Sequence, residues 1–236
     1  MPPPDKSPAR IAAMFEAIAA RYDFLNHFLS AGLDRRWRAR TVRELQLAPG
    51  ARVVDLCTGT GDLAIAKARA ADRTRVVGVD FAGAMLRLAA GKVRQTGLAG
   101  AIALVRGDAA AIPVRSGWAD AATIAFGIRN VNQPERAFGE LARVLKPGAR
   151  LAILEFGEPT APGLRALYKW YFRAVLPRVG RLVSKHESAY SYLPASVGAF
   201  PSPVEFAAFI ARNGFTDVRS VPMSLGIVYL YIARKC

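Results

Sequence analysis

Apolar and polar positions alternate along this chain with two different periods, and each period predicts a different kind of element. Between residues 11 and 22, apolar side chains recur every three or four positions, which predicts an amphipathic helix. A second helical segment carries the cluster DRRWRAR (34–40) and runs to about Leu47, where Pro49-Gly50 ends it. The chain is therefore expected to begin with helices.

From residue 52 onward, short apolar runs alternate with helical segments. Strands are expected at 52–57, 75–80, 101–108, 119–127 and 150–156. Helices are expected at 62–71, 82–96 and 134–145, the last of them stopped by Lys146-Pro147-Gly148. The first strand is almost wholly apolar, which is typical of a strand buried on both faces. Successive βα units of this kind predict an α/β fold with an open, mostly parallel sheet and helices on both faces.

Residues 157 to about 200 break this rhythm and predict an inserted cap. The chain then resumes with an expected helix at 203–213 and two β-rich runs at 217–224 and 226–234. The connection between these runs is short, so they are expected to add antiparallel edge strands. The length of 236 residues fits a single domain over 1–236, with lid helices at about 8–47 and the cap as its additions.

Composition narrows the class of protein. With 52% hydrophobic residues the chain is not a disordered polycation, although its net charge is +15. Two cysteines and two histidines exclude a disulfide scaffold and a Cys-based zinc cluster, and no metal site is expected. The first residues lack the apolar core of a secretion signal, and no apolar run is long enough to span a bilayer, so a cytoplasmic protein is expected. Its charge points to nucleic acid or to an anionic membrane as a partner.

A glycine-rich loop, DLCTGTGDLA (55–64), follows the first strand. Its G-x-G-x-x-A pattern first suggests a dinucleotide, whose pyrophosphate needs helix N-terminal amides and no negative charge nearby. Asp55 and Asp62 flank this loop and disfavour such a ligand. They suit S-adenosylmethionine, which has a sulfonium cation and no phosphate, and Gly59 and Gly61 would let the backbone approach it closely.

Acidic residues also end the next two strands. Asp80 lies 19 residues after Gly61, where a carboxylate can accept hydrogen bonds from both ribose hydroxyls. Asp108 ends the third strand, where it can meet an adenine amino group. Each Asp taken alone could instead cap the following helix. Acids at the ends of three successive strands favour the cofactor-binding interpretation.

These motifs, in this order, resemble the class I S-adenosylmethionine-dependent methyltransferases, which have a Rossmann-like fold. Further blocks resemble the ubiquinone/menaquinone biosynthesis C-methyltransferases, and the resemblance runs from about Met14 to Lys235. The blocks are RYDFLNHFLSAGLDRRWR (21–38), VVDLCTGTGDLA (53–64), IAFGIRNV (124–131), RVLKPGARLAILEF (143–156) and GIVYLYIARK (226–235). The chain departs from the family pattern at Asp34, at Ala125, where Ser is frequent, and at Ala149 and Gly157.

The resemblance implies which residues contact the cofactor and what the reaction is. Thr60, Asp80, Asp108 with Ala109, and Ala125 should contact S-adenosylmethionine. The implied reaction transfers a methyl group to a ring carbon of a polyprenylated quinol, and the CTGTGD loop is more similar to the menaquinone-type members. A methyltransferase acting on another lipid or small molecule is an alternative, as is a basic RNA-binding methyltransferase, although the chain lacks RNA methyltransferase motifs and no nucleic acid is expected.

Four residues are candidates for the chemistry. Arg129 and Asn130, just beyond the fourth strand, are expected to reach the quinol oxygens. The alternative for Arg129 is a pair with a nearby carboxylate. Tyr22 and Asp23, with Asn26, follow the first helix and could close over the site as a lid, although core packing is favoured for Tyr22 itself. His27 is interpreted as incidental and Cys57 as a small core residue.

The predicted cap contains a basic amphipathic helix at 163–175. Residues 157–190 carry six Lys or Arg against two acids, Glu158 and Glu187, and the cationic face and Trp170 fit an anionic membrane surface. The apolar stripe of this helix could instead pack on the sheet. Together with the cluster at 35–40, this segment predicts a peripheral association with the inner face of the cell membrane. The oligomeric state is left open, with a homodimer as one alternative.

Overall fold

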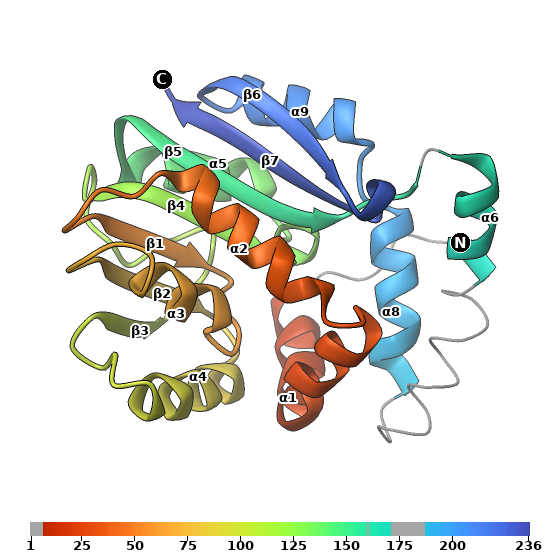
Figure 1. The fold of residues 1–236 in the computed structure, drawn as a ribbon, viewed down its shortest axis with the longest axis horizontal. Coiled ribbons are helices and arrows are strands. Elements are labelled where there is room, and N and C mark those ends of the chain that lie inside the picture. The colour runs from red at the N-terminus through yellow and green to blue at the C-terminus, as the bar shows by residue number, and fades with distance from the viewer. Residues whose placement is uncertain (1–6, 160, 171–186) are drawn as a thin grey trace.

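The computed structural model describes residues 7–159, 161–170 and 187–236, and one seven-stranded sheet organises them (Figure 1). The strands are β1 (Arg52–Leu56), β2 (Arg75–Asp80), β3 (Ile102–Arg106), β4 (Ala119–Ala125), β5 (Leu145–Phe156), β6 (Phe215–Met223) and β7 (Val228–Lys235). Their order across the sheet is β3-β2-β1-β4-β5-β7-β6. The first five strands are parallel, and β7 runs antiparallel between β5 and β6.

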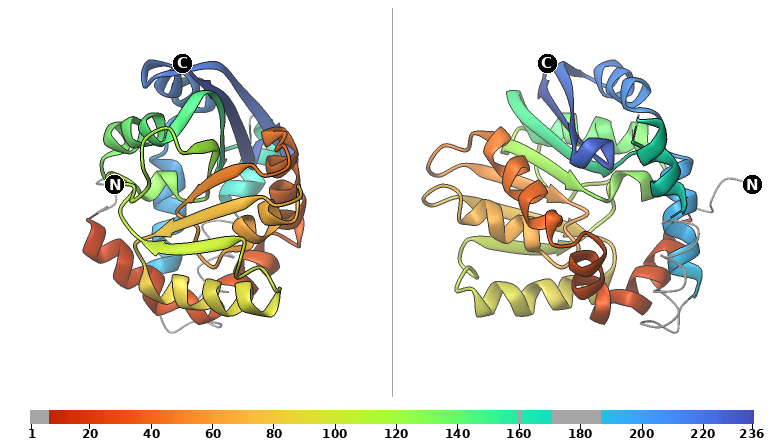
Figure 2. Two further views of the ribbon diagram at one scale, coloured as in Figure 1. Left: turned by 90° about the vertical axis from the view of Figure 1, so that its left-hand side faces the viewer. Right: turned by 45° about the vertical axis from the view of Figure 1, so that its right-hand side comes forward.

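Helices cover both faces of the sheet, as Figure 2 shows. They are α1 (Pro8–Leu29), α2 (Leu33–Leu45), α3 (Asp62–Ala68), α4 (Gly83–Gln95), α5 (Pro134–Val144), α6 (Pro162–Trp170), α8 (Glu187–Gly198) and α9 (Pro203–Arg212), with the 3₁₀ turns η1 (Ile128–Asn130) and η3 (Ser224–Gly226). The predicted α/β class and mostly parallel sheet are confirmed.

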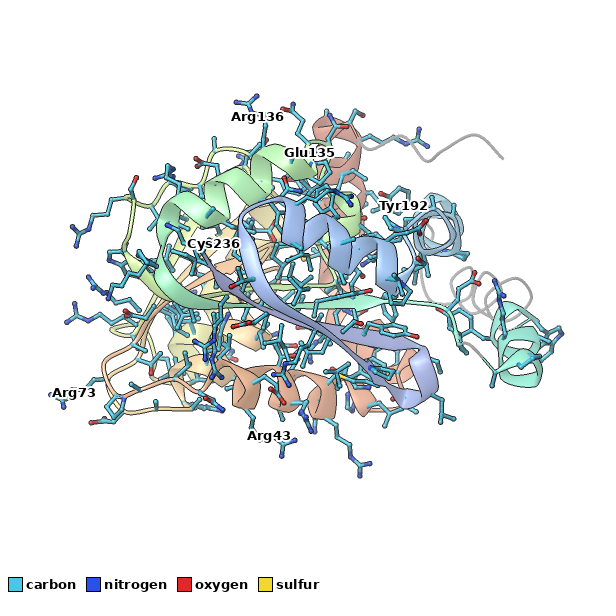
Figure 3. The ribbon with its side chains drawn as sticks, turned by 90° about the horizontal axis from the view of Figure 1, so that it is seen from above. Arg43, Arg73, Glu135, Arg136, Tyr192 and Cys236 are labelled. Carbon is cyan, nitrogen blue, oxygen red and sulfur yellow. The ribbon has the colours of Figure 1, made fainter. Side chains whose placement is uncertain are left out.

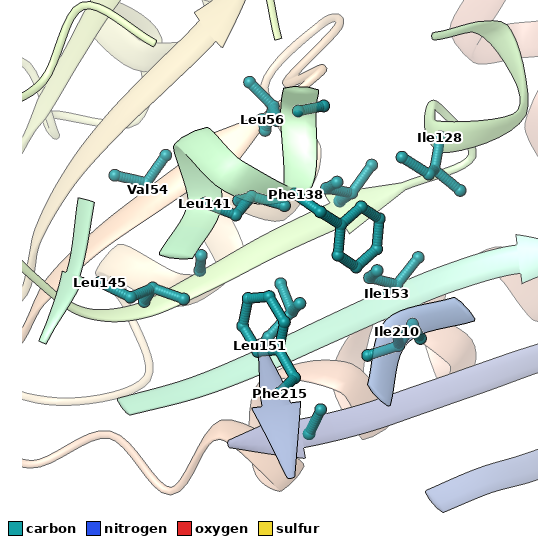
Figure 4. Close-up of a cluster of buried hydrophobic side chains, with 14 of the residues drawn as sticks. Val54, Leu56, Ile128, Phe138, Leu141, Leu145, Leu151, Ile153, Ile210 and Phe215 are labelled. Carbon is teal, nitrogen blue, oxygen red and sulfur yellow. The ribbon is translucent and has the colours of Figure 1, made fainter. Parts of the chain in front are cut away.

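Neighbouring residues of one strand contribute to different cores. Val54 belongs to the apolar cluster beneath α5 and α9, which includes Phe138, Leu141 and Phe215 (Figure 4). Val53, one residue earlier, belongs to the cluster on the other face, together with Trp37 of α2 and Ile65 of α3. Side chains of a strand alternate between faces, so the wholly apolar run at β1 is explained by burial on both sides.

One expected strand boundary and one expected strand position were wrong. Strand β5 begins at Leu145, so Lys146-Pro147-Gly148 lies within the strand instead of only ending a helix. Leu145 pairs with Ala119, and the register then shifts before Ala121. Of the two C-terminal strands, β6 lies at the edge as expected, but β7 is an interior strand because it hydrogen-bonds to β5 on its other side.

Helices α1 and α8 lie beyond the carboxyl ends of the parallel strands, where they pack against each other (Figure 1). Helix α1 extends from Pro8 to Leu29 and is longer than the predicted 11–22. In the cap, the predicted helix 163–175 is described as far as Trp170. Its later stripe residues Tyr171, Phe172 and Val175, and Arg173, lie outside the described residues.

Within the described ranges, no individual helix has both the length and the apolar character needed to cross a bilayer. One pair, Tyr192–Gly198 with Pro203–Arg212, passes such a test together by length and composition but bends by 71° between its halves.

Candidate functional site: two joined cavities at the strand ends

The glycine loop turns sharply between β1 and α3. Thr58 donates its backbone N–H to the Val79 carbonyl at 3.0 Å, and Gly61 donates to the Thr58 carbonyl at 3.0 Å. Gly59 and Gly61 have φ of +56° and +82°, a region that favours glycine. A Cβ on Gly61 would lie 3.1 Å from the Cβ of Ala89, whereas one on Gly59 would meet open space. Gly61 thus serves packing against α4, and Gly59 leaves room for a ligand.

The carboxylate of Asp55 lies beneath this loop and not in the site. It accepts hydrogen bonds from the hydroxyls of Thr58 at 2.6 Å and Thr123 at 2.5 Å. It also pairs with the ammonium group of Lys67 at 2.5 Å, and both side chains are almost completely buried. With both oxygens engaged, the expectation that Asp55 binds cofactor is corrected: its side chain supports the loop from below.

Asp80 occupies the centre of the site. One carboxylate oxygen accepts the Gly59 N–H at 2.8 Å, and the other accepts the Ala82 N–H at 2.9 Å. Each oxygen can accept a further hydrogen bond. Burial raises the pKa of this carboxyl, against the opposing effect of the Ala82 and Gly59 amides. Asp80 is thus held in a fixed orientation with acceptor capacity to spare.

Two cavities open at Asp80. The first, called here the strand cavity, is lined by residues that follow β2 and β3, among them Asp108 and Ala109. The second, called the lid cavity, is lined by Phe15 and Tyr22 of α1 together with Gly59, Ala125 and Phe126. The two cavities share the lining residues Cys57, Asp80, Phe81, Gly127 and Asn130. They therefore adjoin each other along these shared residues.

The sequence-predicted residues divide into two groups. Those that line a cavity are Tyr22, Gly59, Asp80, Asp108, Ala109, Ala125 and Asn130. Those that line neither of these two cavities are Asp23, Asp55, Thr60, Gly61 and Arg129. Asp108 is further ordered by the Ala110 N–H, which donates to its carboxylate at 2.8 Å. Tyr22 lines the lid cavity and also packs against the core cluster of Ala19, Ala82 and Met85, and burial raises the pKa of its phenol.

Arg129 is paired with a carboxylate, which was the alternative to a contact with the quinol oxygens. Its guanidinium pairs with the fully buried Glu155 at 2.7 Å and donates to the Phe126 carbonyl at 2.6 Å. It also lies over the Phe156 ring, 5.4 Å from the centroid. The side chain is only 7% exposed. Direct contact between Arg129 and a substrate oxygen is therefore corrected to a structural role, in which Arg129 holds the turn that carries Phe126 and Asn130.

Asn130 lies at the junction of the two cavities. Its side-chain oxygen accepts a hydrogen bond from the Tyr192 hydroxyl of α8 at 3.0 Å. In this orientation of the amide, the Asn130 NH₂ group remains as a donor. The cap thus contributes to the site through Tyr192, a residue that the sequence analysis did not single out.

A chain of charged groups connects α1 to the glycine loop. Asp23 accepts a hydrogen bond from the Thr60 hydroxyl at 2.5 Å and pairs with Lys92 of α4 at 2.8 Å. Lys92 also pairs with Asp62, which lies 3.3 Å from Arg38. Asp62 and Asp55 are thus both paired with cations. The sequence argument that their negative charges exclude a pyrophosphate from this loop was therefore wrong for both residues. Nothing in the sequence spacing marked Lys92.

Two other lining residues were missed. Cys57 was expected in the core, yet it is half-buried and lines both cavities. Burial is the main cause that raises the pKa of its thiol well above the usual value. Gly127 faces it so closely that a Cβ there would lie 2.4 Å from the Cys57 Cβ. Gly127 belongs to the IAFGIRNV block (124–131), a motif that could have marked it as a site residue. Only Arg129 and Asn130 of that block were predicted to contact the quinol.

With this geometry established, the comparison with known proteins decides the family. Residues 5–235 match the profile of the ubiE/COQ5 methyltransferase family. The chain belongs to this family. A ubiquinone/menaquinone biosynthesis C-methyltransferase UbiE from Syntrophotalea carbinolica is 50% identical over 218 residues, which are 92% of this chain and 91% of that protein. A demethylmenaquinone methyltransferase from Thermus thermophilus is 46% identical over 94% of this chain and 100% of its own length.

Solved structures agree on the fold. An S-adenosylmethionine-dependent methyltransferase from Aquifex aeolicus matches with a TM-score of 0.62 at 20% identity, over 84% of this chain and 89% of the other. A second such methyltransferase, from Thermotoga maritima, matches with a TM-score of 0.64 at 18% identity, over 95% and 99% of the two chains. The predicted class I fold and family are confirmed. As a member of the ubiE/COQ5 family, the protein is an S-adenosylmethionine-dependent C-methyltransferase of quinone biosynthesis.

Proposed function

We propose that this enzyme methylates a ring carbon of a polyprenylated quinol, and that its main substrate is demethylmenaquinol, which it converts to menaquinol. The observation that carries the proposal is the pair of adjoining cavities, in which Asp80 and Asn130 stand where the strand cavity meets the aromatic-lined lid cavity. A cofactor in the first and an aromatic ring in the second would meet at this junction. The name of the Thermus relative and the CTGTGD loop support the naphthoquinol over a benzoquinol.

The strand cavity fits S-adenosylmethionine. When bound, the cofactor supplies an electrophilic methyl carbon on a sulfonium ion. Asp80 would accept hydrogen bonds from the ribose hydroxyls through its remaining lone pairs, and Asp108 with Ala109 would receive the adenine. Gly59 and Ala125 leave space near the methionine end. The Thr60 hydroxyl is bonded to Asp23, so Thr60 would act toward the cofactor through its backbone amide.

The lid cavity would hold the quinol ring. Loss of a phenolic proton makes the adjacent ring carbon strongly nucleophilic, so hydrogen-bond donors at the quinol oxygen favour the reaction. Asn130 offers its NH₂ group, and Tyr22 offers its phenol, whose pKa is raised by burial. The aromatic side chains of Phe15 and Phe126 would pack against the faces of the quinol ring. Such positioning of two reactants can supply roughly 7–11 kcal/mol of the barrier reduction.

An anionic membrane is the proposed location of this substrate. Arg36 and Arg43 lie seven residues apart on the exposed face of α2, and Arg43 projects away from the sheet (Figure 3). A basic helix face of this kind attracts anionic headgroups. Vesicle co-sedimentation tests this: binding should require anionic lipid and weaken with salt, whereas equal binding to neutral vesicles, or binding to RNA alone, would contradict it.

The decisive assay supplies the purified protein with labelled S-adenosylmethionine and a reduced quinol. Demethylmenaquinol or a short-chain analogue should accept the label at least as well as a matching benzoquinol. Methylation of RNA with no label in either quinol would refute the proposal. Preference for the benzoquinol would refute only the choice of ring.

A further inference from the structure

Apolar side chains continue out of the lid cavity onto the surface. Five of them come from the β4–η1 turn, the ends of β5 and β6, and the connection that joins β6 to β7. They are Phe126, Phe156, Met223, Leu225 and Ile227, and together they are called here the apolar strip. All except Leu225 pack, partly exposed, against the core cluster that contains Trp37. None of the five carries a polar side chain.

The inner end of the strip is Phe126. Its ring lines the lid cavity, with its centroid 4.6 Å from that of Phe156 and 6.1 Å from that of Trp37. Phe126 has φ of +55°, a strained conformation for a residue with a Cβ. A 2.7 Å hydrogen bond from its N–H to the Leu154 carbonyl and the contact of its own carbonyl with Arg129 hold it there. Strain of this kind persists only where the surroundings impose it.

The middle of the strip crosses three strands. Val228 of β7 pairs with Phe156 of β5 on one side and with Met223 of β6 on the other. Directly paired residues project to the same face of a sheet, with neighbouring strands about 4.8 Å apart. Phe156 and Met223 thus lie on one face, and this face leads from the cavity toward the outer turn η3.

The outer end is Leu225. Its side chain is 77% exposed, and its φ is +59°, beside Ser224 with φ of +46°. Burial does not explain this turn, since its leucine faces solvent. It is instead anchored from both sides: the Trp37 indole donates to the Ser224 hydroxyl at 2.9 Å, and Gly157 donates to the Ile227 carbonyl at 3.0 Å. The protein therefore holds an apolar side chain outward in a strained conformation.

We infer that the apolar strip binds the first isoprene units of the quinol's prenyl tail. The inference rests on the proposed function, because a ring held in the lid cavity must lead its tail out of the protein. The strip begins at a wall of that cavity, carries no charge, and ends beside α2, whose outer face carries Arg36 and Arg43. A tail that follows it emerges where the basic helix would meet lipid headgroups.

The test compares two naphthoquinols, one unprenylated and one with two isoprene units, in the wild-type enzyme and two variants. Met223→Gln alters the middle of the strip. Leu225→Asn alters its exposed end, and Asn tolerates a positive φ. Val204→Asn is the matched control, since Val204 is 78% exposed on α9, away from the strip. Wild-type kcat/KM should be higher for the prenylated quinol.

Each strip variant should lower kcat/KM for the prenylated quinol about fivefold to twentyfold, which corresponds to the loss of one or two methylene-sized contacts. Neither variant should change kcat/KM for the unprenylated quinol. Val204→Asn should change neither value. Equal losses on both quinols, or no advantage of the tail in the wild type, would overturn the inference while methyl transfer still supports the function. If the wild type methylates neither quinol, the proposed function falls and the inference with it.

Discussion

Thr60, in the glycine loop, donates its hydroxyl hydrogen to Asp23 of α1 across 2.5 Å. Lys92 completes the contact, with its ammonium group 2.8 Å from Asp23 and 3.1 Å from the Thr60 oxygen. The helix that walls the lid cavity is thereby fastened to the glycine loop. Opening of the lid and release of the cofactor are expected to be linked.

Asp23→Asn should therefore loosen α1. The pair is partly exposed, so screening reduces its value to about 1 kcal/mol, which corresponds to roughly fivefold faster cofactor dissociation. Hydrogen exchange should accelerate in α1 and not in β1. Asp72→Asn, which removes an exposed carboxylate from a surface pair with Arg73, is the control and should change neither rate. Unchanged α1 exchange in Asp23→Asn would show that the contact does not fasten the lid.

Asp80→Ala should abolish cofactor binding and preserve the fold. Two hydrogen bonds to a charged acceptor are worth about 1.5–3 kcal/mol each, so affinity should fall at least a hundredfold in calorimetry. Circular dichroism should stay native, because the Asp80 side chain binds backbone amides of the loop ends, among them those of Gly59 and Ala82, and no residue of the core. Normal affinity in this variant would refute the ribose assignment.

The raised pKa of Asp80 predicts opposite pH responses of affinity and stability. Only the carboxylate accepts from both ribose hydroxyls, so cofactor affinity should fall as pH drops through the raised pKa. Stability changes the other way. Since the pKa is raised above 3.8 in the folded state, the folded protein binds the extra proton, and this group's contribution to stability declines as pH rises through the same range. Calorimetry across pH measures the affinity response in the wild type, and thermal unfolding measures the stability response, which should vanish in Asp80→Ala.

Arg129→Ala should leave the buried charge of Glu155 unpaired, which destabilises a protein by about 3–5 kcal/mol. The double variant Arg129→Gln with Glu155→Gln should recover much of that stability in urea unfolding. Turnover should stay low in both, because Arg129 holds the turn that positions Phe126 and Asn130, while cofactor affinity changes little. Full recovery of turnover in the double variant would show that Arg129 contributes only to stability.

The parts of this site that depend on topology could be predicted from the sequence. Parallel strands end at one edge of the sheet, so Asp80 and Asp108 were expected together and both line the strand cavity. The parts that depend on a partner distant in the chain could not. The residue type and position of Asp55 suggest a ligand-binding group. Only the structure shows that Lys67 of α3 and Thr123 of β4 surround its carboxylate.

Backbone conformation was the second limit. The expected strand 119–127 includes Phe126, whose apolar character fits a strand. Its positive φ ends β4 at Ala125 and turns the ring toward the lid cavity, a property that neither apolar pattern nor propensity encodes. The residues of η3 also have positive φ, and from the sequence they were predicted only as a short connection between two strands. The hydrogen bond from Trp37 that anchors this turn joins residues 187 positions apart, so it could be found only in the structure.

The placement of β7 has a consequence for how the molecule is synthesised. Among the residues that the structure describes, all those that line the two cavities precede position 134, yet β5 gains its second neighbour only when residues 228–235 become available. During translation, the cofactor-binding half can leave the ribosome well before the sheet is closed. Until then β5 presents an unpaired edge, and β6 has no strand to join. A nascent chain of this enzyme is thus most exposed to aggregation just before its synthesis reaches β7.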